Sequence, residues 1–389
     1  MNAQLAKFKK VAILLAAIFA ASTSATAHAD WSIIGLGTLG GHDSSATDIN
    51  DSGQVVGRSF TTSGSNHAFI TGPNGLGMTD LGTLGGSYSI ALGINDSGQV
   101  VGESAIAGIH PAHGFITGPN GIGITDLGTL GGIVSSATGI NDSGQVIGAS
   151  STASDYHRHA FITGPNGVGM TDLGMWYVTG INNSEQIVGG STLIGGISHA
   201  FITGPNGIGM TDLGNLGGNG SGASDINNSG QVVGSSHIAG DVLYHGFITG
   251  PNGIGMTDLG TFGGILSSAY GINDSGEVVG IALTADVRWH SFIFSHGGMT
   301  DLSALAPVVA AGWTDLNAVR INNNGQITGT GIHNKHEEAF LLSYTPDTVF
   351  TPNPIFIPPP IPEPETYLML LGGLGLIGYL ARRRKEAAI

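Results

Sequence analysis

The 389-residue sequence contains no cysteine, which excludes disulfide bonds and thiolate metal sites. Charged residues are also scarce, at 10% of the chain, whereas Gly reaches 67 residues and hydrophobic residues 41%. A chain this apolar is not disordered, and its many glycines indicate many tight turns. Its length allows two ordinary domains or one large repeat domain.

Basic residues are nearly absent from the central part of the chain. Positions 30–361 contain five Lys and Arg against 24 Asp and Glu. A surface with five scattered bases repels phosphate backbones, so the composition argues against nucleic acid as a partner. Cations, neutral glycans and basic proteins remain open.

Long apolar runs occur only near the two ends. Three lysines precede VAILLAAIFAA, and a small-x-small stretch ends at Ala29, before Asp30. This order predicts a secretory signal peptide over residues 1–29, cleaved between Ala29 and Asp30. The run has about half of the ~20 residues that a membrane span needs, which disfavours the alternative of an N-terminal anchor.

The C-terminal end has three features in a fixed order. A Pro-rich linker over 346–361 leads to Pro362-Glu363-Pro364, an apolar helix is expected over 367–380, and basic residues occupy 382–385. A helix of this length spans about 21 Å, which is short for a hydrocarbon core of ~30 Å. The basic residues behind it would hold the C-terminus on the cytoplasmic side of the membrane.

Segment 362–389 resembles the PEP-CTERM sorting signal of Gram-negative bacteria. The resemblance implies that an exosortase-type membrane transpeptidase processes the chain near Pro362, Glu363 and Pro364. It further implies passage across the inner membrane, transient residence there through the apolar helix, and a final location at the cell surface or outside the cell. An uncleaved tail anchor is the alternative.

One unit of about 45 residues recurs seven times between the two ends. An Ile-Asn pair begins at Ile49, Ile94, Ile140, Ile181, Ile226, Ile272 and Ile321. A second marker, H-x-F, begins at His67, His113, His159, His199, His245 and His290, with Glu338-Ala339-Phe340 as a degenerate seventh copy. Seven copies fill the region 30–345.

Each unit predicts four short strands. An alternating stretch and GQVVG flank an N-D-S-G type of turn, and HAFIT and GMTDLG flank G-P-N-G. Four strands per unit at this period predict an all-β, seven-bladed β-propeller. The last unit lacks a fourth strand, and WSIIGLG at 31–37 aligns with it, so we expect the N-terminal strand to close the ring. A β-solenoid is the alternative.

The repeats resemble the HAF-repeat family of extracellular bacterial proteins over residues 31–344. The resemblance rests on H-A-F at His67, His159 and His199, on INDSGQVVG at 49–57 and on DLGTLGG at 80–86. It departs at MWYVTG after Gly174 and where SALAPVVAAGWTDLN replaces TLGG in the last repeat. The family implies export and repetition without a defined reaction.

Identical residues at sevenfold positions lie on a circle, whereas a catalytic site brings unlike residues together. We therefore expect the H-x-F histidines to be structural, bonded to a neighbouring strand or to the aspartate of T-D-L-G, rather than a ring of metal ligands. Turn geometry explains the N-D-S-G segments, which lack the closing Glu of an EF-hand. No cofactor is expected, and calcium alone is left open.

The stretches after each GQVVG vary from repeat to repeat, and in a propeller they share one rim, where loops carry binding. The aromatic and basic residues that stand out there and at the repeat junctions are Tyr156, Arg158, Trp176, Tyr177, Tyr244, Arg288, Trp289 and Trp313. Aromatic faces with few polar groups suit sugar rings, so these residues form the candidate binding surface. The alternative is that many of them fill gaps between blades.

The leading hypothesis is an exported, exosortase-sorted binding or structural module that is not an enzyme and whose partner is exopolysaccharide or a surface protein. The second is a propeller glycosidase or polysaccharide lyase, which needs paired carboxylates about 5 to 10 Å apart. Candidates that break the repeat are Asp155, Glu185, Asp241, Asp286, Glu337 and Glu338. The third is a matrix component with no soluble ligand.

Overall fold

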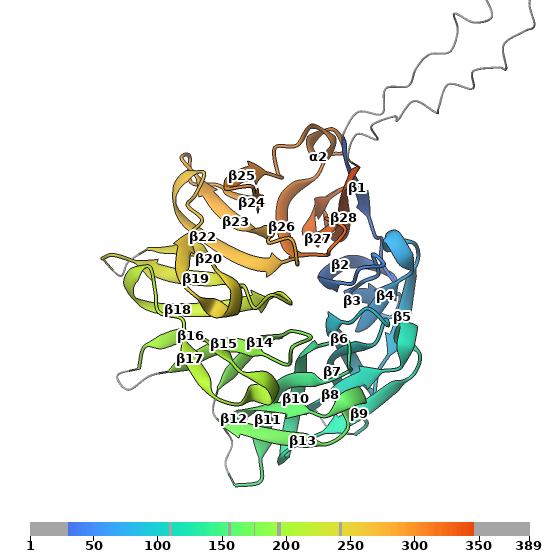
Figure 1. Cartoon of the computed structure of the whole chain (residues 1–389). Coiled ribbons are helices and arrows are strands. Elements are labelled where there is room, and N and C mark those ends of the chain that lie inside the picture. The colour runs from blue at the N-terminus through green and yellow to red at the C-terminus, as the bar shows by residue number, and fades with distance from the viewer. Residues whose placement is uncertain are drawn as a thin grey trace, which may run out of the picture. The chain divides into compact units, whose positions relative to one another are not determined.

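A computed structural model describes residues 30–345 apart from 109–110, 155–156, 175, 193–195 and 241–242. The predicted signal peptide, linker and sorting segment lie outside the described residues. The described chain forms seven four-stranded antiparallel sheets arranged around a central axis, as Figure 1 shows. The predicted seven-bladed β-propeller is therefore confirmed.

The blades repeat one strand order from the axis outwards. The inner strands are β2 (Gly40–Ile49), β6 (Gly85–Ile94), β10 (Gly131–Ile140), β14 (Tyr177–Ile181), β18 (Gly217–Ile226), β22 (Gly263–Ile272) and β26 (Thr314–Ile321). The second strands are β3 (Val55–Thr61), β7 (Val100–Ile106), β11 (Val146–Thr152), β15 (Ile187–Thr192), β19 (Val232–Ile238), β23 (Val278–Thr284) and β27 (Ile327–His333). The third strands are β4 (Asn66–Thr71), β8 (Ala112–Thr117), β12 (Arg158–Thr163), β16 (Ser198–Thr203), β20 (Tyr244–Thr249), β24 (Trp289–Ser295) and β28 (His336–Thr345). The outer strands are β5 (Met78–Gly82), β9 (Ile124–Gly128), β13 (Met170–Gly174), β17 (Met210–Asp212), β21 (Met256–Asp258), β25 (Gly298–Asp301) and β1 (Asp30–Gly35). We number the blades 1 to 7 in the order of these inner strands.

The N-terminal strand closes the ring, as the sequence predicts. Strand β1 pairs antiparallel with β28 in blade 7, from Asp30 opposite Thr345 to Gly35 opposite Phe340. The first and last described strands thus share one sheet. Blade 7 therefore has four strands like the other blades, and β1 covers the outer edge of β28.

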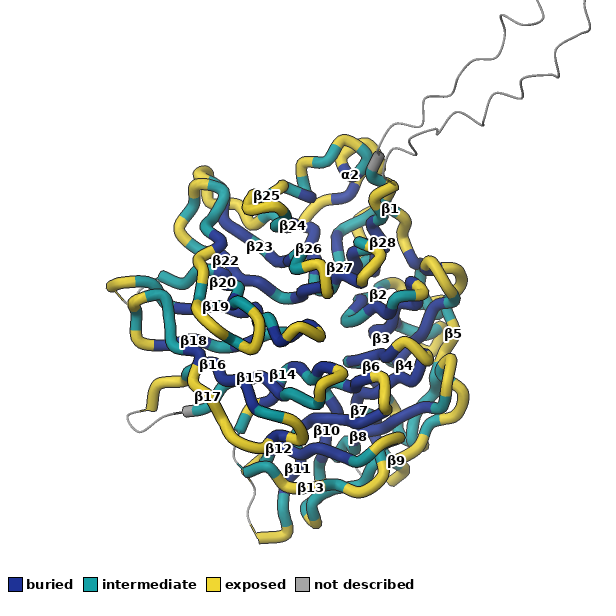
Figure 2. Tube along the Cα trace, in the orientation of Figure 1, coloured by how far each residue is buried: buried dark blue, intermediate teal, exposed yellow. Residues whose placement is uncertain are grey.

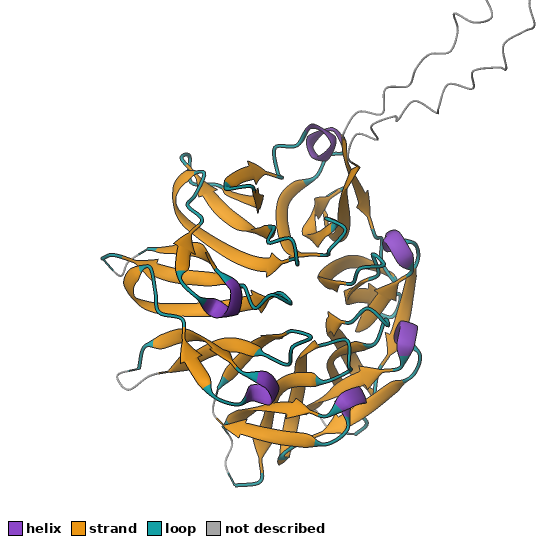
Figure 3. Ribbon diagram, in the orientation of Figure 1, coloured by secondary structure: helices purple, strands orange, loops and turns teal. Residues whose placement is uncertain are grey.

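Two kinds of tight turn connect the strands of a blade. In the N-D-S-G turns the glycine takes the left-handed conformation, for example φ 75° at Gly53. The G-P-N-G segments form single 3-10 turns in which the Asn is left-handed, with φ 54° at Asn74. Figure 3 shows these short turns beside the strands, together with the one α-helix of the described chain, α2 (Ala306–Ala310). No described helix has the length and apolar character needed to cross a membrane.

The core lies between adjacent blades. The Phe of each H-x-F marker is at most 1% exposed, so every blade contributes one fully buried ring: Phe69, Phe115, Phe161, Phe201, Phe247, Phe292 and Phe340. Figure 2 shows the buried residues concentrated along the inner and middle strands. Burying seven aromatic rings and their β-branched neighbours supplies the main stabilisation in a chain without disulfides.

Antiparallel connections give the propeller two different faces. The N-D-S-G turns (first to second strand) and the G-P-N-G turns (third to fourth strand) lie on one face, which we call the turn face. On it the Asn74 amide donates to the Ser52 carbonyl at 3.2 Å, so the two turns of a blade touch. The connections from second to third strand lie on the opposite face, which we call the loop face. The variable stretches therefore share one face, as predicted.

Candidate functional site

The axial channel is lined by residues from all seven inner strands. Each inner strand carries a β-bulge two residues before the Ile of the Ile-Asn pair. The bulged residues are Thr47, Leu92, Thr138, Thr179, Ser224, Tyr270 and Val319. A bulge re-aims the side chain of the extra residue, and here all seven line the channel.

The half of the channel nearer the loop face is a hollow of about 500 Å³, which we call the axial hollow. The seven bulged residues line it together with Tyr177 and Arg320. The Tyr177 side chain is 69% exposed, and Tyr270 contributes a second phenol. The wall thus differs from blade to blade, although the strands around it are repeats.

Three charged side chains meet inside the channel, from blades 1, 5 and 7. The Nε atom of Arg320 lies 3.7 Å from Oδ1 of Asp48 and 3.9 Å from Oδ2 of Asp225. Arg320 also donates from a guanidinium nitrogen to the Tyr270 carbonyl at 2.8 Å. We call these three residues the channel triad.

Both carboxylates of the triad connect adjacent blades. The Asp48 carboxylate accepts a hydrogen bond from the backbone amide of Ile49 in its own strand, at 2.9 Å. It accepts a second one from the backbone amide of Ile94 in the next blade, at 3.0 Å. Asp225 likewise accepts the amides of Ile226 at 2.9 Å and Ile272 at 3.2 Å. All four carboxylate oxygens of the triad therefore accept backbone hydrogen bonds.

Burial shifts the titration of these carboxylates. About a fifth of each carboxylate side chain remains exposed to the channel. Loss of hydration raises the pKa of Asp48 to about 6, although Arg320 and the two amides oppose the shift. The same loss raises the pKa of Asp225.

Seven carboxamides form a closed ring where the channel meets the turn face. The side-chain nitrogen of each Ile-Asn asparagine donates to the backbone carbonyl of the next blade's asparagine, at 2.9–3.3 Å. The ring consists of Asn50, Asn95, Asn141, Asn182, Asn227, Asn273 and Asn322. The last bond, from Asn322 to Asn50, closes the ring across the first and last repeats.

A second ring of side chains follows directly outside the first. The residue that follows each of these asparagines donates from its backbone amide to the side-chain oxygen of the equivalent residue in the next blade, at 2.8–3.0 Å. Its members are Asp51, Asp96, Asp142, Asn183, Asn228, Asp274 and Asn323. Burial is the main cause of the raised pKa of Asp96, and the neighbouring carboxylates raise it further.

These carboxylates attract cations electrostatically. Within the described ranges, however, no group of three or more His, Asp, Glu or Cys side chains is arranged to hold a metal ion. The hydrogen bonds of both turn-face rings join adjacent blades.

The H-x-F histidines lie on the third strands and not on the channel wall. Each pairs through Nδ1 with the T-D-L-G aspartate of the same blade at 2.7–2.9 Å, which confirms the predicted partner. Asp80 also accepts the Gly82 amide at 2.7 Å, so the pair fixes the corner at which the outer strand ends. These six pairs are repeated structural contacts.

The predicted binding residues divide into exposed and packed groups. Tyr177 is 69% exposed and Trp289 41%, and the Arg288 side chain, 76% exposed, lies 3.2 Å from Asp286. Arg158 is also exposed, at the start of β12. Tyr244 is half-buried at the start of β20. Tyr156 lies outside the described residues.

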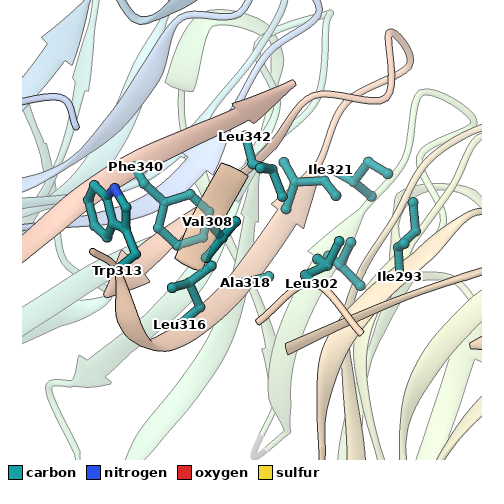
Figure 4. Close-up of a cluster of buried hydrophobic side chains, with 11 residues drawn as sticks. Ile293, Leu302, Val308, Trp313, Leu316, Ala318, Ile321, Phe340 and Leu342 are labelled. Atoms are coloured by element: carbon teal, nitrogen blue, oxygen red, sulfur yellow. The ribbon is translucent and has the colours of Figure 1, made fainter. Parts of the chain in front are cut away.

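Two tryptophans of the predicted surface pack inside the propeller. Trp313 is 4% exposed and belongs to the core of blade 7, where Figure 4 shows it beside Phe340. Its ring stacks on His333 at a centroid distance of 4.5 Å, so it is a core residue and not part of a binding surface. The Trp176 ring lies against the Phe201 ring, with 5.6 Å between their centroids, and fills space next to the core.

The carboxylates proposed for catalysis do not form one site in the described structure. Glu185 belongs to a turn-face turn, with φ 64°. Asp286 belongs to a loop-face turn beside Arg288. Glu338 pairs with His333, and Glu337 is exposed on the same strand. Asp155 and Asp241 lie outside the described residues.

Sequence reasoning missed the channel triad. The residue before the Ile of each Ile-Asn pair is Gly in four repeats, Asp in two and Arg in one. A comparison of the repeats at this position would have singled out Asp48, Asp225 and Arg320. Their convergence requires the ring, because the three residues lie in three different repeats.

Residues 360–385 match the model of the PEP-CTERM protein-sorting motif. This match indicates an exported protein that an exosortase processes at the inner membrane of a Gram-negative bacterium. No functionally curated protein matches the chain in sequence.

Solved structures with a similar fold include a β-propeller domain. One is the β-propeller domain of the Trilobed protease from Pyrococcus furiosus, with 12% identity, coverage of 67% of this chain and 84% of that chain, and a TM-score of 0.51. That domain is described as having an open velcro topology, whereas β1 closes the ring here. Another is YCF48 bound to D1 peptide, with 13% identity, coverage of 82% and 97%, and a TM-score of 0.51. At these identities the likeness shows the fold alone.

Proposed function

We propose that the propeller is the non-catalytic binding module of an exported surface protein, and that it binds a neutral exopolysaccharide at the loop-face opening of its axial channel. One observation carries the proposal: the axial hollow joins unlike side chains from seven otherwise repeated blades. Convergence of non-equivalent residues is what a specific site requires.

The chemistry of the axial hollow suits a sugar. Tyr177 and Tyr270 offer aromatic faces. The hydroxyls of Thr47, Thr138 and Thr179 donate to backbone carbonyls and so leave only their lone pairs as acceptors for a ligand. The excess of acidic residues in the chain disfavours an anionic polymer, and Arg320, the charged residue of the lining, already lies between two carboxylates. A neutral polysaccharide fits this balance better than an acidic one.

Glycan-array binding to the propeller of residues 30–345 tests the proposal, with and without Ca²⁺. This segment contains every strand of the closed ring. We expect specific binding that Tyr177→Ala abolishes. Tyr344→Ala, which removes an exposed tyrosine ring of blade 7 outside the axial hollow, is the matched control. Absence of glycan binding by the unmodified propeller, together with capture of a defined protein, would overturn the proposal.

Surface sorting has its own test in the full-length protein. Deleting residues 362–389 is expected to abolish surface display, and replacing Pro362, Glu363 and Pro364 by Ala is expected to leave the protein in the inner membrane. Surface display that persists in both variants would contradict exosortase sorting.

A glycosidase or polysaccharide lyase is the second candidate, and one observation favours it. The pKa of Asp48 is raised to about 6, a value suited to a general acid, and a second carboxylate lies across Arg320. The backbone hydrogen bonds to all four oxygens argue for a structural role instead. Release of new reducing ends or unsaturated products from a polysaccharide panel, lost in Asp48→Asn, would support the enzyme.

A further inference from the structure

A second cavity opens between blades 4 and 5, beside the axial hollow. It measures about 610 Å³, within the range of about 300–1,000 Å³ typical of ligand pockets. Strand β18 forms its floor from Asn219 to Gly222. We call this cavity the β18 groove.

Gly222 of β18 leaves the space of the groove open. A Cβ on Gly222 would meet nothing within 4 Å, and one on Gly220 would lie 3.3 Å from the Ser198 carbonyl oxygen. Neither glycine has a positive φ, so the backbone does not require Gly at either position. The missing side chain of Gly222 therefore leaves space that the fold does not need, whereas a side chain at position 220 would press against the backbone of blade 4.

Comparison with the other blades shows how unusual this space is. The positions equivalent to Gly220 hold Asp43, Tyr88, Val134 and Leu266. Those equivalent to Gly222 hold Ser45, Ile90, Ser136, Tyr177, Ser268 and Asn317. Blade 5 alone has Gly at both positions.

Among the described residues, the lining of the groove contains no carboxylate, Lys or Arg. It combines the Tyr244 ring, the His237 imidazole, the Asn219 carboxamide and several serine hydroxyls. His237 Nδ1 lies 3.2 Å from Asn219 Oδ1, which orients both groups. An uncharged lining with one aromatic face suits a neutral sugar in a domain that is otherwise acidic.

The groove and the axial hollow are consecutive along one strand. Residues Asn219 to Gly222 line the groove, and Ala223 and Ser224, which follow directly, line the hollow. The same holds for β22, where Ser268 lines the groove and Tyr270, two residues further on, lines the hollow. A ligand that fills one cavity can therefore continue into the other.

We infer that the β18 groove is a second subsite for the same neutral polysaccharide, so that the propeller binds an extended stretch of chain running from the groove into the axial hollow. This inference rests on the proposed function. It predicts that affinity rises with oligosaccharide length until both cavities are filled, because each filled cavity adds contact area.

Titration calorimetry with neutral oligosaccharides of increasing length tests the inference on residues 30–345, and a uronic-acid series serves as the anionic control. Gly222→Ile fills the groove with the residue that blade 2 has at the same position, and Tyr244→Ala removes its ring. Each variant is expected to weaken binding of long oligosaccharides by about tenfold and to leave short ones unchanged. Tyr344→Ala, which removes a 44% exposed tyrosine ring of blade 7 outside both cavities, is the matched control and is expected to change neither.

The outcomes separate the two proposals. Unmodified propeller that binds glycans and loses binding in Tyr177→Ala, but not in Gly222→Ile or Tyr244→Ala, would overturn the groove and leave the axial hollow standing. Unmodified propeller that binds no glycan would overturn both. If Gly222→Ile fails to fold, Tyr244→Ala alone decides the question.

Discussion

The carboxylate of Glu338 lies over the α-carbon of Gly35, in the space that a Cβ on Gly35 would occupy. Both residues belong to blade 7, where β1 closes the ring. Glu338 stands where the other blades have the histidine of H-x-F, and Gly35 stands where they have its aspartate, opposite the buried Phe. Glu338 accepts instead from His333 Nδ1 at 2.6 Å and from the Gly37 amide at 3.0 Å. The closing blade thus replaces the His–Asp contact of the other blades by a His–Glu contact.

Gly35→Asp is expected to destabilise the propeller by about 2–4 kcal/mol, because a second carboxylate would meet Glu338 where space and charge both oppose it. The double variant Gly35→Asp with Glu338→His recreates the pair of the other six blades and is expected to regain at least half of that loss. The free energies of unfolding, measured with guanidinium chloride, compare the three proteins. A double variant no more stable than Gly35→Asp would show that the pair does not transfer to blade 7.

Trp313→Ala is expected to destabilise the protein by about 3–5 kcal/mol, because it leaves a cavity in the core of blade 7. Trp313 is 4% exposed and packs on both Phe340 and His333. Trp289→Ala removes the same side chain from a site that is 41% exposed and is expected to have a much smaller effect. Equal losses of unfolding free energy would contradict the assignment of Trp313 to the core.

Two neighbouring isosteric changes are expected to act in opposite directions. Asn95→Asp replaces a nitrogen that donates to Gln99 Oε1 at 2.9 Å and to the Asn141 carbonyl at 3.1 Å, so it would set a carboxylate against two acceptors. We expect a loss of about 3 kcal/mol at neutral pH, recovered in part when acid protonates the new side chain.

Asp96→Asn is expected to stabilise the propeller by about 0.5–1 kcal/mol at neutral pH. Burial and the adjacent Asp51 and Asp142 carboxylates raise the pKa of Asp96, so its charge is unfavourable in the folded protein. The change keeps the oxygen that accepts the Asp51 amide at 2.9 Å. Thermal unfolding of the parent, Asp96→Asn and Asn95→Asp shows whether each change raises or lowers the stability. An Asp96→Asn variant less stable than the parent would indicate that the carboxylate is needed.

Asp48 is expected to make the stability depend on pH in the acidic range. Its pKa is raised from 3.8 to about 6 on folding, so between these values the folded protein holds a proton that the unfolded chain has released. The free energy of unfolding therefore falls as the pH rises through this window, by about 2–3 kcal/mol at most, and levels off above it. Below 3.8 both states are protonated and the effect vanishes.

Asp48→Asn is expected to flatten that slope. Urea unfolding across the window compares the variant with the parent, and the difference between the two curves isolates Asp48 from the other carboxylates. Asp286→Asn is the control, because the pKa of Asp286 is lowered, chiefly by its hydrogen bond from Thr284. Asp286 therefore makes the stability depend on pH only below 3.8, and its removal should leave the slope within the window unchanged. An unchanged slope in Asp48→Asn would contradict the assignment.

The sequence by itself determined the repeat architecture, because the signals that specify it are local. The spacing of the Ile-Asn pairs sets the number of blades, the N-D-S-G and G-P-N-G segments set the hairpins, and 31–37 supplies the strand that the last repeat lacks. The sorting motif is likewise a linear signal, which matches over 360–385. Side-chain pairing within a blade, such as His67 with Asp80, follows from the same hairpin geometry.

Only the tertiary structure decided what the blades bring together. Asp48, Asp225 and Arg320 meet because ring closure places three distant repeats around one axis, and no local pattern encodes that proximity. The inner-strand bulges turn one variable residue of each repeat into the channel, which a strictly alternating strand would not do. Trp313 and Tyr177 are both aromatic residues at irregular junctions, yet one is buried and the other exposed, because burial depends on neighbours from other parts of the ring.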